Sequence, residues 1–231
     1  AMPMGQFFGG KSVPMVGVSA VGTAPDKRGG GAALSMMRSM MLEMREAGFA
    51  VSTLYPASRG LYRKAGYEVA GVHCTVQVPA RTLRTSERPL DVRPAVPADF
   101  DAMERAYRAQ AVHSPGHLDR GAYVWHRIRH PRDETARGFV FERHGALEGY
   151  VYLYEKRRMP TFVYDLHLTD AVTTTPDAAR ALLGFLGDHS TLGVDVTFAT
   201  GPVEPLVMML PDIDYTSRVS DHWMLRVLDV T

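Results

Sequence analysis

The stretch VSAVGTAPDKRGGGAALSMM, residues 18–37, places three consecutive glycines between a β-branched run and a methionine-rich segment. An apolar face at helical spacing predicts a helix from Gly31 to Ala47, formed by Leu34, Met37, Met41 and Met44. The N-terminus of a helix exposes unpaired N–H groups and carries partial positive charge. Glycines at that position remove Cβ atoms and let a bulky anion approach the backbone. The stretch therefore predicts an anion-binding loop that opens a helix.

Strands and helices alternate around this loop. We expect strands over 13–23, 50–55 and 67–78, and a short helix over 59–65 that begins after Ser58. Gly48 and Gly66 follow the two helices, as C-terminal capping glycines do. The order strand, loop, helix, strand, helix, strand predicts an α/β fold for this part of the chain.

Composition places the chain among ordinary globular proteins. Its 231 residues suggest one large or two ordinary domains, and 45% hydrophobic residues are enough to form a core. The net charge of +1 does not favour nucleic acid or a membrane surface as a partner. Cys74 is the one cysteine, and no apolar span or leader is evident, so we expect a soluble cytoplasmic protein.

The remaining chain reads as a linker and a second unit. Residues 79–91 are polar and proline-flanked, so we expect domain boundaries at 1–78 and 92–231 with this linker between them. In the second domain the pattern predicts strands near 92–93, 162–171, 194–200 and 222–230, a hairpin over 139–155, and helices over 97–109, 121–129, 176–186 and 205–210.

Two common phosphate-binding motifs do not fit the glycine loop. A P-loop needs Lys and then Ser or Thr after its last glycine, but Ala32 and Ala33 follow here. The dinucleotide fingerprint needs spaced glycines and an acidic residue about 20 residues later, whereas the next strand ends in Tyr55 and Pro56. A glycine-rich turn with no ligand is the remaining alternative.

The order Arg28-x-x-Gly31-x-Ala33 after a strand resembles motif A of the GNAT N-acetyltransferases, which holds the pyrophosphate of acetyl-CoA. The segment ASRGLYRKAGYEVAG, residues 57–71, resembles motif B of the same family. By this resemblance Tyr62 is the catalytic residue that protonates the departing CoA thiolate. A phenol with a pKa near 10 holds its proton at neutral pH and can donate it to a thiolate. The alternative is a tyrosine that only packs its helix onto the sheet.

A closer resemblance is to the enhanced intracellular survival (Eis) family of multi-acetylating N-acetyltransferases. The matches to its two signatures are Ala20-Val21, Pro25, Arg28, Gly31, Ala57-Ser58, Tyr62 and Gly66-Tyr67. The likeness continues more weakly through RPLDVRPAVPADFDAMERAY, residues 88–107, at the start of a second, degenerate GNAT-like domain. It implies an α/β (α+β) fold of tandem GNAT-like domains with mixed, largely antiparallel sheets. By comparison with the family, the resemblance implies that this sequence lacks the first part of the N-terminal GNAT domain and the C-terminal sterol-carrier-like domain.

The resemblance also assigns a site. The acetyl and pantetheine arm is expected at Val21, Gly22 and Thr23, and further groove residues at Ser58 and Arg59. The pyrophosphate is expected on Arg28 and on the amides of Gly29, Gly30, Gly31, Ala32, Ala33 and Leu34. Gly29 replaces a second family arginine, which should weaken pyrophosphate binding. The family's general base is a terminal carboxylate, a role that we do not transfer to Thr231.

These features predict an acetyl-CoA-dependent N-acetyltransferase that acts on aminoglycoside or lysine-type amines. Family resemblance adds a homo-oligomer, a hexamer, and export as an alternative to a cytoplasmic location. A second reading is a non-catalytic acyl-CoA-binding or assembly module, and a third is a nucleotide-binding α/β protein. Partners of other kinds, nucleic acid and membrane, are not expected.

Two pairs of histidines, His113/His117 and His126/His130, have metal-ligand spacing. No H-E-x-x-H motif is present, so no metal is expected. In the second domain Asp170 and Asp177 flank the start of a predicted helix, where carboxylates would repel a diphosphate. We therefore expect no CoA site there.

Overall fold

The structure is a computed structural model that describes residues 1–230; Thr231, the last residue of the second expected domain, lies outside this range. The chain divides into two compact units. Unit 1 comprises Ala1–Val72, Ala111–Tyr123 and the residues from Asp221 onward, and unit 2 comprises His73–Gln110 and Val124–Ser220. The expected domain boundaries stay a prediction, because β4 (Glu68–Pro79) and β11 (Thr216–Val227) each contribute residues to both units.

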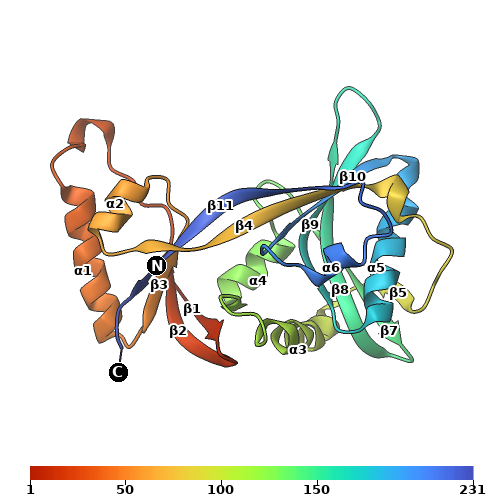
Figure 1. Cartoon of the computed structure of the whole chain (residues 1–231), viewed down its shortest axis with the longest axis horizontal. Coiled ribbons are helices and arrows are strands. Elements are labelled where there is room, and N and C mark those ends of the chain that lie inside the picture. Colours follow the sequence, from red (N-terminus) through yellow and green to blue (C-terminus); the bar gives the residue numbers. More distant parts are fainter. Residues whose placement is uncertain (231) are drawn as a thin grey trace. The chain divides into compact units, whose positions relative to one another are not determined.

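Unit 1 is built around a strand–helix–strand crossover (Figure 1). β2 (Lys11–Val18) leads through the glycine loop into α1 (Ala32–Glu46), and the chain returns in β3 (Val51–Leu54), which is parallel to β2 with Met15 opposite Val51. α2 (Arg59–Lys64) follows. The strand order is β4–β11–β3–β2–β1–β6, where β1 is Met2–Phe8 and β6 is Leu118–Asp119.

The core of unit 1 lies between its strands and the two helices. Met37 and Met41 of α1 are 0% and 1% exposed, so the apolar face predicted for this helix is confirmed at these two positions. They pack with residues of the strands and α2: Val18, Leu54, Tyr62, Ala65, Tyr67 and Met224. This packing fixes α1 and α2 on one face of the strands, next to the points where β2 and β3 end (Figure 1).

Unit 2 has a six-stranded order, β5–β7–β8–β9–β10–β4. The new strands are β5 (Asp91–Pro94), β7 (Arg137–Arg143), β8 (Ala146–Arg157), β9 (Tyr164–Thr173) and β10 (Gly193–Thr200). Neighbouring strands in this order are antiparallel except β9 and β10, which are parallel. The expected mixed, largely antiparallel α/β architecture is therefore confirmed.

Helices cover both faces of the unit 2 strands (Figure 1). Val151 and Leu153 of β8 belong to the core beneath α5 (Pro176–Asp188), whereas Tyr152 between them contacts Met103 of α3 (Phe100–Ala111). Because neighbouring residues of a strand point to opposite faces, α3 and α5 lie on opposite sides. α4 (Ala122–Arg129) joins α3, and the short α6 (Pro205–Met208) follows β10.

The segment expected as a linker packs inside unit 2. A 3-10 helix, Ala80–Leu83, occupies part of the range 79–91. Ala80, Leu83 and Leu90 are 0%, 2% and 6% exposed and lie in the core with α5. The sequence did not reveal that these three residues are buried, because polar residues separate them.

Candidate active site

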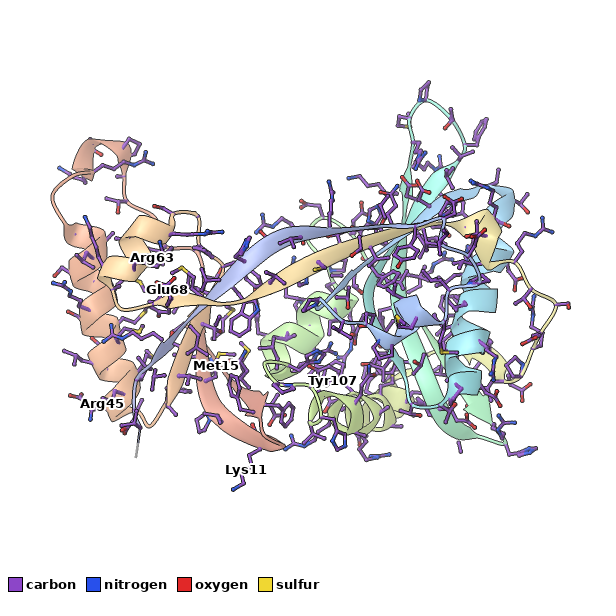
Figure 2. The ribbon with its side chains drawn as sticks, viewed as in Figure 1. Lys11, Met15, Arg45, Arg63, Glu68 and Tyr107 are labelled. Carbon is purple, nitrogen blue, oxygen red and sulfur yellow. The ribbon has the colours of Figure 1, made fainter. Side chains whose placement is uncertain are left out.

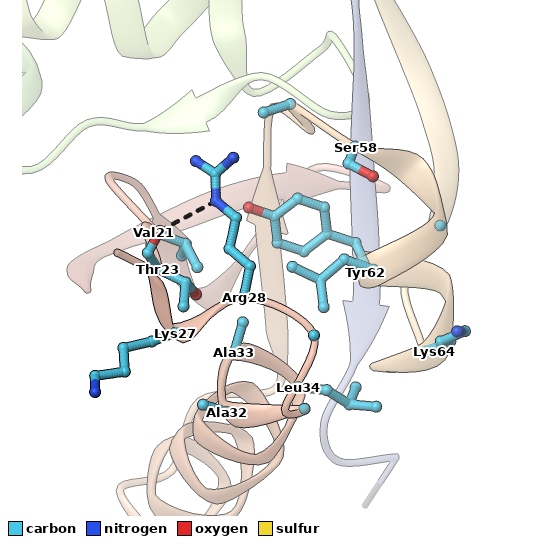
Figure 3. Close-up of a pocket in the computed structure, with 15 residues that line it drawn as sticks. Val21, Thr23, Lys27, Arg28, Ala32, Ala33, Leu34, Ser58, Tyr62 and Lys64 are labelled. Atoms are coloured by element: carbon cyan, nitrogen blue, oxygen red, sulfur yellow. Dashed lines mark hydrogen bonds between the residues drawn. The ribbon is translucent and has the colours of Figure 1, made fainter. Parts of the chain in front are cut away.

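A cavity of about 790 Å³ opens in unit 1 at the edge where β2 and β3 end. Parallel strands bring their carboxyl ends to one edge, and such edges are common ligand sites in α/β structures. The size falls within the roughly 300–1,000 Å³ of small-molecule pockets. Its lining comprises Val21, Thr23, Lys27, Arg28, Gly29, Gly31, Ala32, Ala33, Leu34, Ala57, Ser58, Gly60, Leu61, Tyr62 and Lys64 (Figure 3).

The cavity brings together most of the residues predicted from the two motifs. Gly22, Gly30 and Arg59, also predicted, are neighbours in sequence of lining residues and are not part of the lining. Sequence reasoning missed Lys27, Ala57, Gly60, Leu61 and Lys64. The two lysines could have been suspected from the sequence, because each lies beside a residue of a recognised motif. They were not selected, because a charged side chain alone usually indicates a solvated surface.

The glycine loop presents its backbone to the cavity. Gly29 and Gly31 have φ angles of +89° and +77°, in the left-handed region that favours glycine. Gly31 is the N-cap residue of α1, and the first intrahelical bond runs from Ser35 N–H to the Gly31 carbonyl at 3.0 Å. By helix geometry the amides of Ala32, Ala33 and Leu34 therefore have no partner within α1. A Cβ atom on any of the three glycines would meet nothing within 4 Å, so open space faces the loop.

The charges of the lining have one sign. Lys27, Arg28 and Lys64 contribute cations, and no Asp or Glu occurs among the described residues that line the cavity. The first turn of α1 contains no acidic residue and no side-chain cap. The positive end of the α1 dipole and these three cations therefore favour an anionic ligand.

Arg28 extends across the cavity (Figure 3). It follows a 3-10 turn, Pro25–Lys27, in which Lys27 N–H donates to the Ala24 carbonyl at 2.9 Å. Its Nε donates to the Thr23 carbonyl at 3.4 Å. The long bond uses one of five guanidinium N–H groups, so the terminal nitrogens keep donors for a phosphate.

The corresponding helix start in unit 2 is closed by its own side chains. Thr175 caps α5 by accepting a hydrogen bond from Ala178 N–H at 3.1 Å. Asp177 in the first turn pairs with Arg143 at 2.7 Å and with Arg180 at 2.8 Å. A capped helix start that already carries a paired carboxylate differs from the open start of α1, and the absence of CoA binding at α5 stays a prediction.

Tyr62 of α2 points into the cavity toward Arg28 (Figure 3). The side chain is only 6% exposed, and burial raises its pKa above the usual value of 10. Its ring meets the Tyr67 ring edge-on at a centroid distance of 6.1 Å. The phenol therefore stays protonated at neutral pH, as a proton donor must.

The buried Tyr67 side chain supports the Tyr62 ring. Its hydroxyl lies 2.7 Å from Ser52 Oγ on β3 and 3.1 Å from Met41 Sδ on α1. The chain turns between the two tyrosines at Gly66, where φ is +83°, and Tyr67 N–H donates to the Tyr62 carbonyl at 3.0 Å. Side chains of β3 and α1 thus hold the Tyr67 ring, which packs against the Tyr62 ring.

Within residues 1–230, no group of three or more His, Cys, Asp or Glu side chains is arranged to hold a metal ion. The His126 and His130 rings lie 4.8 Å apart at their centroids. In the same part of the chain, no helix is long and apolar enough to cross a membrane.

Comparison with known families gives two matches. Residues 1–70 and residues 116–227 each match a family model described as an acetyltransferase (GNAT) domain. An uncharacterized N-acetyltransferase of Streptomyces avermitilis is 31% identical over 113 residues, which is 47% of this chain and 28% of that protein.

Solved structures match over nearly the whole chain. A GCN5-related N-acetyltransferase from Anabaena variabilis matches with a TM-score of 0.92 at 33% identity. The match covers 99% of this chain and 58% of the Anabaena variabilis chain. One from Kribbella flavida has a TM-score of 0.80 at 27% identity, with 98% and 55% covered. Eis1 from Mycobacterium abscessus has a TM-score of 0.74 at 20% identity, with 99% and 60% covered, and is alike in fold.

Proposed function

We propose that this chain, which carries two GNAT acetyltransferase domains, transfers the acetyl group of acetyl-CoA to a primary amine at the cavity of unit 1. GNAT domains of this class use acetyl-CoA as their co-substrate. The acceptor class, aminoglycoside or lysine-type amines, rests on the resemblance of residues 13–71 to the Eis family. The same resemblance is the basis for proposing a homo-oligomer, and we propose a cytoplasmic location.

One observation carries the proposal: an open, cationic helix start and a buried, protonated tyrosine line the same cavity. Acetyl-CoA has a pyrophosphate at one end of its pantetheine arm and a thioester at the other. A site for it therefore needs anion donors and a proton donor within one groove. The amides of Gly29 to Leu34 together with Arg28 fit the first requirement, and Tyr62 fits the second.

The glycines support this fit. Because a Cβ at Gly29, Gly30 or Gly31 would enter the open space before α1, glycine at these positions keeps that space clear for the pyrophosphate. The apolar side chains of Val21, Leu34 and Leu61 line the cavity and suit the less polar pantetheine arm.

The proposed chemistry follows from these roles. The amine loses a proton and attacks the thioester carbonyl, and backbone N–H groups near Val21 to Thr23 donate to the oxygen on which charge develops. Tyr62 Oη gives its proton to the sulfur as the carbon–sulfur bond breaks. Buried side chains hold the ring, so the donor is positioned before the reaction begins. The group that removes the amine proton is left unassigned.

The test is release of CoA thiol from acetyl-CoA with a panel of polyamines, aminoglycosides and lysine peptides. We expect amine-dependent release, with an acetyl group added to the acceptor by mass spectrometry. No release with any amine would contradict catalysis by this chain. Tight acetyl-CoA binding without release would instead support the non-catalytic acyl-CoA-binding module.

A further inference from the structure

We infer that Arg226 is a positioning residue for Tyr62, because its guanidinium anchors the end of α2 and so fixes the direction in which the phenol points. The inference rests on the proposed function, in which Tyr62 gives its proton to the departing thiolate. It adds a residue that no sequence motif indicates, since Arg226 contacts Ala65 across 161 positions of the chain.

α2 is too short to hold Tyr62 in place by itself. The helix has six residues, Arg59–Lys64, and isolated helices of this length are unstable in water. The side chain of its N-cap residue, Ser58, makes no capping hydrogen bond. The orientation of Tyr62 therefore depends on the contacts that other elements make with this helix.

Arg226 makes such a contact at the C-terminal end of α2. It lies on β11 opposite Ser52 of β3, and its Nη1 atom donates a hydrogen bond to the carbonyl of Ala65. Ala65 is the C-cap residue of α2 and is only 2% exposed. The last carbonyls of a helix have no partner within it and carry partial negative charge. A guanidinium at this point therefore satisfies both the hydrogen bond and the charge of the helix end.

The same guanidinium covers the turn between Tyr62 and Tyr67. A Cβ atom on Gly66 would lie 3.3 Å from Arg226 Nε and 3.4 Å from its Cζ, so the arginine packs directly on this glycine. Burial raises the pKa of Tyr67, and the nearby charge of Arg226 opposes that rise. Arg226 therefore acts both on the end of α2 and on the residue whose ring supports Tyr62.

Arg226 is not among the described residues that line the cavity. Its contacts are separate from the start of α1, where the pyrophosphate is proposed to bind. Loss of these contacts should let α2 shift and turn the Tyr62 hydroxyl away from the sulfur. We therefore expect turnover to depend on Arg226, and the affinity for acetyl-CoA to depend on it much less.

Arg63 offers a matched control at the same end of α2. It binds both carboxylate oxygens of Glu68 at 2.8–3.1 Å (Figure 2), and the two side chains are 56% and 63% exposed. Exposed ion pairs contribute little to stability, because water and salt compete for both partners. Arg63→Met removes the same kind of side chain without touching the Ala65 carbonyl, so it should leave turnover unchanged.

The test measures kcat and the Kd for acetyl-CoA after Arg226→Met, Arg226→Lys or Arg63→Met, each made in wild type and in Tyr62→Phe. In wild type we expect Arg226→Met to lower kcat about tenfold, because a small displacement of a catalytic group is costly. Arg226→Lys keeps the charge but lacks the planar group over Gly66, so we expect a loss of about threefold. The Kd should stay close to that of wild type. In Tyr62→Phe neither change should lower kcat further, because the effect passes through the phenol.

The outcomes separate this role from the proposed function. Unchanged kcat in folded Arg226→Met, an equal loss in Arg63→Met, or the same fractional loss in Tyr62→Phe as in wild type overturns the role of Arg226 and leaves the proposed function standing. If Arg226→Met does not fold, Arg226→Lys decides by the same comparisons. Wild type without amine-dependent turnover overturns the proposed function, and the role of Arg226 with it.

Discussion

The ring of Tyr62 meets the ring of Tyr67 edge-on, with centroids 6.1 Å apart and an interplanar angle of 73°. Tyr67 in turn shares a hydrogen bond of 2.7 Å with Ser52 of β3, so a buried polar pair supports the residue that faces the cavity. The two tyrosines therefore have separable roles. Tyr62 is the proposed proton donor, and Tyr67 fixes its position.

Replacing Tyr62 by Phe removes the proton donor and keeps the ring. We expect turnover to fall about 100-fold, as for the loss of a general acid, with the Kd for acetyl-CoA changed little. Because burial raises the pKa of Tyr62 above 10, the wild-type donor stays protonated between about pH 6 and pH 9. Steady-state kinetics across this range test both points, and undiminished turnover in Tyr62→Phe would remove the residue from the mechanism.

Replacing Tyr67 by Phe leaves the Ser52 hydroxyl without this partner in a buried position. The expected loss is about 1–2 kcal/mol in the free energy of unfolding, measured by urea denaturation. Turnover should fall much less than in Tyr62→Phe, since the ring contact remains. A loss of turnover as large as that of Tyr62→Phe, in protein that is still folded, would contradict the division of roles.

Gly31 and Gly48 form a matched pair at the two ends of α1. Their φ angles are +77° and +86°, and a Cβ on either would meet nothing within 4 Å. Alanine at each position should cost about 1 kcal/mol of stability through the left-handed backbone. Only Gly31→Ala should also weaken acetyl-CoA binding, because its Cβ enters the anion-binding space. Equal affinities of the two variants for acetyl-CoA in calorimetry would contradict the proposed pyrophosphate site at the glycine loop.

Gly187 tests the packing of unit 2. A Cβ there would lie 2.5 Å from the Leu83 carbonyl oxygen, so α5 can approach the 3-10 helix Ala80–Leu83 only with glycine. We expect Gly187→Ala to lower the free energy of unfolding by about 1–3 kcal/mol. Gly201→Ala, whose Cβ would first meet an atom at 4.0 Å, is the control. A neutral Gly187→Ala variant would mean that the range 79–91 does not pack as described.

The parts of the fold that local patterns specify could be predicted from the sequence. The helix expected over 31–47 is α1 at Ala32–Glu46, and the helix expected over 59–65 is α2 at Arg59–Lys64. Capping glycines and methionines at helical spacing fix these boundaries within the segment itself. The same local order brings Arg28, the glycines and Tyr62 to one cavity.

Elements that depend on distant partners could not be predicted. β1 was not expected, because Pro3 and Gly5 weaken its strand pattern, yet it pairs with β2 along its whole length and with β6 at Gly5 and Gln6. β11 begins at Thr216, before the expected start at 222. The sequence did not predict the first residues of this strand, because they are exposed and show no apolar alternation. Lys64 was not predicted as a site residue, because only the folded structure shows that it lines the cavity.

The most direct test of the central claim is a crystal structure of this chain with coenzyme A. The account predicts pyrophosphate density against the amides of Gly29 to Leu34, with the thiol end beside Tyr62 Oη. Coenzyme A bound elsewhere, or with its pyrophosphate away from the start of α1 at saturating concentration, would contradict it.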